Sequence, residues 1–161
     1  MSVRVFLFTV LAALTACSPM AADAGQKAAA AAPARHPESG LEVVSLTITS
    51  ANGRHPFRVE VARSEPEQAK GLMFRTAMGA NAGMIFPMEP ARQASFWMKN
   101  TVIALDLVFI GPDRRIESIA ASAVPYSLSP ISSKAAVSAV LELNGGRAAQ
   151  LGLAPGDVVS W

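Results

Sequence analysis

The chain has 161 residues, which is enough for one ordinary globular domain. It carries 14 Lys and Arg residues against 12 Asp and Glu residues, so its formal net charge is only +2. A nucleic-acid-binding surface needs basic residues clustered with aromatic residues, and the sequence has no such cluster. We therefore do not expect nucleic acid as a partner.

The N-terminus has the layout of an export signal. Residues 1–4 form a short basic segment, and residues 5–14 form an apolar run that is too short to span a bilayer as a helix. The run ends in Leu14-Thr15-Ala16-Cys17, which resembles the lipobox of bacterial lipoproteins, where the cysteine becomes the diacylated N-terminus. We expect a signal peptide over residues 1–17 and lipid attachment at Cys17.

This signal predicts an exported lipoprotein that is anchored in a membrane and faces the periplasm of the cell envelope. Ser18 follows the cysteine, a pattern that resembles lipoproteins sent to the outer membrane. The alternative is an ordinary cleaved signal whose site is Ala22-Asp23-Ala24, with the cysteine incidental.

Cysteine and histidine are scarce, which limits the chemistry that is possible. Cys17 is the only cysteine, so a mature domain without it has no disulfide, thiol nucleophile or thiolate-bound metal. The two histidines are His36 and His55, and the first lies in a stretch rich in Ala and Pro. One chain cannot build a three-histidine zinc site, and we expect neither a cofactor nor a resident metal.

The composition divides the remainder into a tether and a domain. Residues 18–40 are rich in Ala, Pro and small polar residues and have no hydrophobic periodicity, which predicts a disordered tether. Residues 41–161 are predicted to form a single β-rich domain. It begins with alternating apolar residues on both sides of Asn52-Gly53, the pattern of a β-hairpin with a tight turn.

A short helix is predicted next, because Ser64-Glu65-Pro66-Glu67 has the pattern of a capping box and the apolar stripe ends near Gly71. Later, Asn144 is placed to cap a second short helix over residues 145–151, with Gly152 at its C-terminal end. Further strands are predicted over residues 83–88, 94–100, 105–110, 115–124, 137–143 and 158–161, and a loop over 125–134.

These elements predict a mainly β (α+β) fold. About seven or eight short strands and two short helices would form a mainly antiparallel sheet. We expect the sheet to curl into a small barrel or half-barrel, because an open sheet of this size would leave its edges exposed.

Six segments resemble the family called domain of unknown function 192, in order and in approximate spacing. They are Gly71-Leu72-Met73-Phe74-Arg75, Gly83-Met84-Ile85-Phe86, Phe96-Trp97-Met98-Lys99-Asn100-Thr101, Leu105-Asp106-Leu107-Val108-Phe109-Ile110, Val140-Leu141-Glu142-Leu143 and Gly156-Asp157-Val158-Val159. The resemblance covers nearly all of residues 43–161. It implies a small, mostly β, often exported domain from a family without an established activity.

A hairpin around residues 101–104 would place Lys99 opposite Asp106, beside Trp97. One hypothesis is a binding site for a small polar or anionic envelope ligand. Its candidate residues are Trp97, Lys99, Asn100, Asp106, Arg75 and Tyr126. The alternative is a salt bridge that only fixes the strand register, covered by the tryptophan.

Two other functions are alternatives. Five methionines could bind Cu(I) through their thioether groups, although Met84, Met88 and Met98 are better explained as core residues. The others in this group are Met73 and Met78. A small hydrolase could use Asp106 with Lys99. The sequence favours a binding or accessory domain over an enzyme, and it indicates neither an oligomeric state nor a protein partner.

Overall fold

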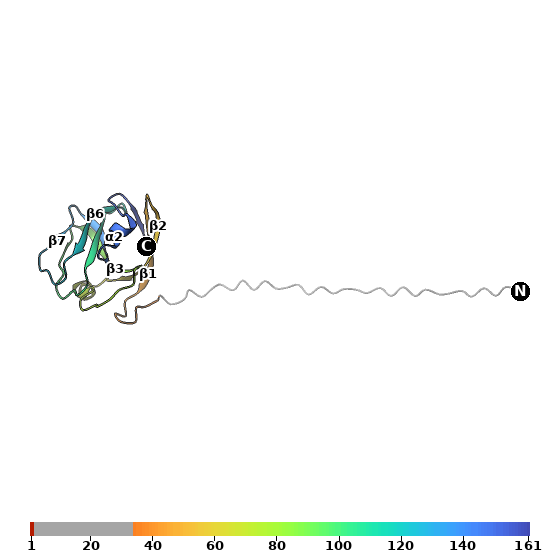
Figure 1. Ribbon diagram of the computed structural model, residues 1–161, viewed down its shortest axis with the longest axis horizontal. Helices are drawn as coiled ribbons and strands as arrows, with labels where there is room; N and C mark the ends of the chain where they lie inside the picture. The colour runs from red at the N-terminus through yellow and green to blue at the C-terminus, as the bar shows by residue number, and fades with distance from the viewer. Residues whose placement is uncertain (2–33) are drawn as a thin grey trace. The chain divides into compact units, whose positions relative to one another are not determined.

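The computed structural model describes Met1 and residues 34–161 of the chain (Figure 1). The predicted signal segment, Cys17 and residues 18–33 of the predicted tether therefore lie outside the described residues. No helix within the described part is long and apolar enough to cross a membrane.

The predicted N-terminal hairpin is confirmed. Strands β1 (Val43–Ser50) and β2 (Gly53–Val61) pair in antiparallel register, with Leu46 opposite Phe57. Both of these side chains are buried. Gly53 has a φ of 124°, a conformation that L side chains rarely adopt, so the tight turn depends on glycine at this position.

The first predicted helix is also confirmed. Helix α1 (Glu65–Lys70) begins with a complete capping box, in which the Ser64 hydroxyl accepts a bond from the Glu67 backbone N–H. The Glu67 carboxylate in turn accepts a bond from the Ser64 backbone N–H. The helix ends at Gly71, as predicted.

Seven strands form one curled sheet in the order β6-β5-β8-β3-β2-β1-β9. The strands not yet introduced are β3 (Ala82–Arg92), β5 (Leu105–Ile110), β6 (Ile116–Ala123), β8 (Val137–Asn144) and β9 (Val158–Ser160). Only β2 and β3 pair in parallel. The two edges meet at a single bridge between Arg115 and Val158, which gives the predicted half-barrel.

The predicted central hairpin is wrong. Strand β5 pairs with β6 on one side and with β8 on the other, so its edges are already occupied. Of the strand predicted over 94–100, only β4 (Ser95–Phe96) forms, and it pairs with β7 (Ile131–Ser132) inside the predicted loop 125–134. In Figure 1, β7 lies at the opposite end of the domain from β1 and β2.

Strands β3, β5 and β8 are covered on both faces. One face contributes to a hydrophobic cluster that includes Ile85, Val108 and Leu141. The other face contributes to a second cluster, whose buried members include Leu72, Met84, Phe86, Met88, Ala94, Met98, Leu107, Phe109 and Val140. The predicted burial of Met84, Met88 and Met98 in the core is confirmed.

The second predicted helix is shorter than expected and has a different cap. Helix α2 (Arg147–Leu151) begins after Gly146, and no side chain at the N-cap position bonds its first turn. Asn144 does not cap it, because its amide donates to the backbone carbonyls of Met78 and Gly79 instead. The carboxyl end at Gly152 is as predicted.

Asp106 supplies the missing cap from strand β5. Its side chain is fully buried and accepts bonds from the backbone N–H groups of Ser122, Gly146 and Ala148, at 2.8, 2.9 and 2.8 Å. These bonds join β5 to β6 and to the start of α2. The predicted pairing of Asp106 with Lys99 is therefore replaced by a structural role.

We expect Asp106→Asn to lower the free energy of unfolding by about 2–4 kcal/mol. Hydrogen bonds to charged groups contribute about 1.5–3 kcal/mol each, and the amide that replaces one carboxylate oxygen would point a donor at a backbone donor. Urea unfolding of the variant and the wild type measures the difference. A loss below about 0.5 kcal/mol, the range of ordinary surface substitutions, would contradict this role.

Candidate functional site

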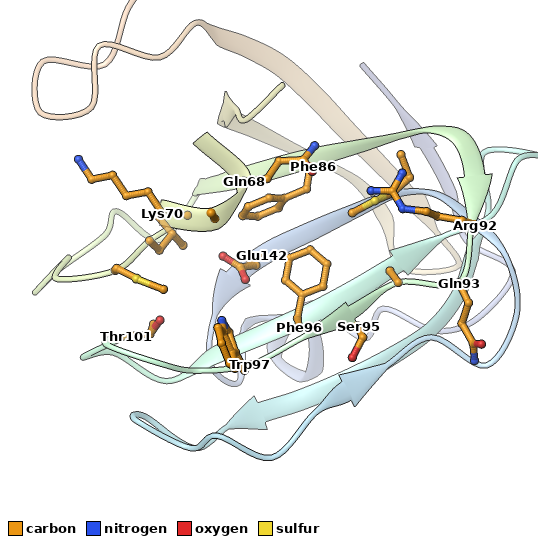
Figure 2. Close-up of a pocket in the computed structure, with 16 residues that line it drawn as sticks. Gln68, Lys70, Phe86, Arg92, Gln93, Ser95, Phe96, Trp97, Thr101 and Glu142 are labelled. Carbon is orange, nitrogen blue, oxygen red and sulfur yellow. The ribbon is translucent and has the colours of Figure 1, made fainter. Parts of the chain in front are cut away.

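A pocket of about 380 Å³ opens between the sheet and the segments that cover its second face (Figure 2). It is lined by residues from α1 and the turn after it, from β3, from the segment 92–101 and from β8. This volume lies in the lower part of the range for small-molecule sites.

Glu142 of strand β8 lines this pocket. It lies between Met84 of β3 and Leu107 of β5 in the sheet, so its side chain belongs to an otherwise apolar face. The residue is only 5% exposed. Among the described residues, nothing donates a hydrogen bond to its carboxyl group or forms an ion pair with it.

Two of the polar side chains that line the same pocket, Gln68 and Thr101, are engaged elsewhere. The Gln68 side chain donates to the backbone carbonyls of Ala62 and Pro87, at 3.2 and 3.0 Å. The Thr101 hydroxyl donates to the carbonyl of Lys99 at 3.3 Å. The domain thus satisfies these donors and leaves the Glu142 carboxyl group for another partner.

Burial raises the pKa of Glu142 from its ordinary value of 4.5 to about 8. The cause is desolvation, because an ionised carboxylate loses its hydration in an apolar environment. At neutral pH the free pocket therefore contains mainly the protonated acid. A buried acid with a strongly raised pKa at the wall of a pocket is a typical feature of functional sites.

Aromatic rings surround the acid. Phe86 and Phe96 pack edge to face, with ring centroids 5.1 Å apart and planes at 83°. Figure 2 shows the Glu142 carboxyl group in the space framed by these two rings and Trp97, while the amino group of Lys70 points away from it. The site thus combines one acid with an apolar, aromatic wall.

A second buried carboxylate lies in the same row of the sheet and provides a comparison. Glu60 of β2 is the register partner of Met84, whose partner on its other side is Glu142. Arg75 pairs with Glu60 through two hydrogen bonds of 2.8 and 3.2 Å. These bonds raise the pKa of Arg75. The carboxylate of Glu60 thus has a cationic partner, whereas the carboxyl group of Glu142 has none among the described residues.

Residues 34–40, the C-terminal part of the predicted tether, pack against this cluster. Glu38 forms an ion pair with Arg75 at 2.9 Å, and the Ser39 hydroxyl donates to Glu60. The prediction that the ordered domain begins at residue 41 is therefore corrected. The segment lines a second cavity of about 370 Å³, which shares Lys70, Gly71 and Met73 with the first pocket.

The structure brings three of the predicted site residues together on one loop. Trp97 lines the pocket and is 51% exposed. The Lys99 amino group lies 5.2 Å from the centroid of the Trp97 ring. Asn100 has a φ of 55°, and its amide lies 3.8 Å from the sulfur of Met73, which lines the same pocket.

The other three predicted residues have separate positions. Asp106 holds β6 and α2, as described above. Arg75 lines the second cavity and pairs with Glu60. Tyr126 is 61% exposed, and its backbone N–H donates to the carbonyl of Thr101, so it lies near the loop without lining the pocket.

The sequence analysis did not single out Glu142. A signal was present in Val140-Leu141-Glu142-Leu143, because an acid stands in the middle of an apolar strand. That both faces of β8 are covered could not be read from this strand alone, since alternation also fits a strand with one solvated face.

The comparisons place the chain in a family. The model of DUF192, described as an uncharacterized ACR, matches residues 47–161. The chain belongs to the DUF192 family. The predicted resemblance is thereby confirmed, and the family remains without an established function.

Two solved structures are similar to this DUF192 domain. A protein of unknown function from Novosphingobium aromaticivorans is 57% identical, with a TM-score of 0.79 over 82% of this chain and 94% of that chain. A putative transcription regulator from Sinorhizobium meliloti is 37% identical, with a TM-score of 0.73 over 74% of this chain and 94% of that one. Comparison with curated proteins gave no match.

The raised pKa of Glu142 predicts a pH-dependent stability. Between pH 4.5 and about 8 the folded state keeps a proton that the unfolded chain releases. Through this group, stability therefore falls as the pH rises across that window, by up to about 1.4 kcal/mol per pH unit, and is constant on either side.

Glu142→Gln removes this contribution, so the wild type should lose stability relative to the variant as the pH rises from about 5 to 8. Urea unfolding of both proteins at several pH values measures the difference. Parallel pH profiles for the two proteins would show that the Glu142 pKa is not raised by folding.

Proposed function

We propose that this DUF192 domain is a binding module for a small polar molecule, held in the pocket that Glu142 lines. The observation that carries the proposal is the carboxyl group itself, which is buried against an apolar face and has no partner among the described residues. The open pocket in front of it has room for a ligand that supplies the missing partner.

The energetics support binding at this position. A buried polar group without a hydrogen bond costs about 1–3 kcal/mol of stability, and an apolar residue of similar size would avoid that cost. A ligand that donates to the carboxyl group recovers part of the cost when it binds. The aromatic wall supplies contact area, as in small-molecule sites where few polar groups fix the orientation.

The geometry favours a polar ligand over an anionic one. The expectation of an anion depended on Lys99 and Arg75 as free cations. Lys99 instead lies over Trp97, and Arg75 is paired with Glu38 and Glu60. An acid at the pocket wall also disfavours an anion by repulsion whenever it is ionised.

The alternative functions have less support from the same geometry. Asp106 has both carboxyl oxygens engaged by backbone N–H groups, so it is poorly placed to act in hydrolysis. Met84 and Met98 are packed among carbon atoms and cannot converge on an ion without unpacking the sheet. Among the residues described as lining the pocket, Glu142 is the only acid, while glycoside hydrolysis uses a pair.

A thermal-shift screen of the purified full chain in detergent tests the proposal. The panel would contain sugars, polyols, amines, amino acids and small carboxylates. We expect a hit that raises the Tm, since a ligand at 100 times its Kd stabilises the folded state by about 2.7 kcal/mol.

The shift should shrink or vanish in Glu142→Gln and persist in Glu89→Gln, which makes the same change at an exposed residue outside the pocket. A hit that Glu142→Gln leaves unchanged would place binding elsewhere. A panel without any hit would count against a small-molecule role for the pocket.

We further propose that the domain acts in the cell envelope as a lipoprotein anchored through Cys17, in the outer membrane. The support comes from the sequence alone: an apolar run over residues 5–14 and a cysteine at the position that the lipobox requires. A diacylated N-terminus anchors far more firmly than a single acyl chain.

Cys17→Ser tests the anchor in a bacterial host. We expect the wild type in the outer-membrane fraction and the variant in the soluble fraction or retained as an unprocessed precursor, measured by fractionation and by the mass of the mature N-terminus. A variant that fractionates and is processed like the wild type would contradict lipid attachment at this residue.

A further inference from the structure

The partner that Glu142 lacks defines the chemistry of the ligand. The carboxyl group needs a hydrogen-bond donor or a positive charge, and three of the side-chain donors that line the pocket are turned to backbone carbonyls. Besides Gln68 and Thr101, the amide of Gln93 donates to the carbonyl of Ser133 at 2.9 Å. These three donors are therefore occupied, and a ligand that brings its own donor supplies the missing partner.

The charged side chains around the pocket do not take this role either. Lys70 and Arg92 line the pocket, yet neither forms an ion pair with Glu142, and Figure 2 shows the amino group of Lys70 directed away from its carboxyl group. Across Met84, the nearest acid in the row is Glu60, whose charge is balanced by Arg75. A single positive charge at this point would therefore be the partner of the ionised form of Glu142.

The surroundings of that point favour a positive charge on an organic molecule. Phe86 and Phe96 lie beside the acid (Figure 2), and aromatic ring faces attract cations through their quadrupoles. The thioether side chains of Met73 and Met88 add soft apolar surface. A hard metal ion needs several oxygen ligands, whereas the described residues contain no group of three His, Cys, Asp or Glu side chains that could hold one.

We infer that the ligand of the Glu142 pocket is an organic cation: a protonated amine whose ammonium group pairs with the Glu142 carboxylate and whose apolar part contacts Phe86 and Phe96. This inference rests on the proposed function, because it names the class of molecule that the same pocket binds. Lys70 and Arg92 disfavour further positive charges at the ends of the pocket, so the ligand is a monoamine rather than a polyamine.

The inference has a consequence for protons. An amine arrives already protonated, and pairing with it favours the ionised form of Glu142. The acid must then release its proton to the solvent, because the free pocket holds it protonated at neutral pH. A neutral ligand that accepts a bond from the protonated acid would release none.

Matched probes separate the two cases. The full chain would be titrated calorimetrically at pH 7 with benzylamine, benzyl alcohol and benzoate, and with the butyl amine, alcohol and carboxylate. We expect each amine to bind at least about tenfold more tightly than its alcohol and its carboxylate. Repeating the titration in buffers with different ionisation enthalpies should reveal the release of about one proton per amine bound.

Two variants locate the effect. Glu142→Gln is nearly isosteric, and it should reduce amine affinity to that of the alcohol and abolish proton release. Glu89→Gln should behave as the wild type, because Glu89 is exposed and does not line the pocket.

The outcomes distinguish this inference from the proposed function. Alcohols or carboxylates that bind as tightly as the amines, or amine binding without proton release, would overturn the organic-cation inference and leave a binding function in place. No binding of any probe, together with no hit in the thermal-shift screen, would overturn both.

Discussion

The sheet imposes one constraint on which the site depends: strands β3, β5 and β8 are covered on both faces. A charged side chain on β8 therefore has no route to solvent except through a gap in the cover. Glu142 occupies such a position, and the pocket is that gap. The two hydrophobic clusters hold the strands in place from both sides, so the sheet cannot easily rotate the acid outward.

The domain compensates its other deeply buried carboxylates. Asp106 accepts three backbone N–H bonds, which anchor β6 and the start of α2. Glu60 is paired with Arg75, which also pairs with Glu38 and so anchors the segment 34–40. Glu142 receives no such compensation and is the one in contact with the pocket. This contrast is what separates a structural acid from a functional candidate in a chain that has several.

Local sequence patterns predicted the elements that depend on near neighbours. The Asn52-Gly53 turn, the Ser64 capping box and the helix end at Gly152 are set by backbone conformation and short-range hydrogen bonds, and all three are present. The loop around Trp97 was predicted to belong to a site because aromatic and polar residues are concentrated there, and Trp97 lines the pocket. The family resemblance was visible in six short segments, one of which contains Trp97.

Long-range pairing could not be predicted in the same way. A hairpin around residues 101–104 would have paired Lys99 with Asp106, but β5 pairs with β6 and β8 instead. The role of Asp106 depends on backbone groups of Gly146 and Ala148, which carry no side-chain signal. Glu142 was overlooked for a related reason. Its carboxyl group lacks a partner because both faces of β8 are covered, and that covering depends on segments far away in the sequence.

The central claim is that the free pocket holds the carboxyl group of Glu142 as a protonated acid. It is tested most directly by an NMR titration of the protein with ¹³C-labelled glutamate side chains, with Glu142→Gln to assign the resonance. The account predicts a carboxyl resonance that titrates near pH 8 and is missing in the variant. Titration of Glu142 near the ordinary value of 4.5 would show that the carboxylate is already solvated or paired, and would contradict the account.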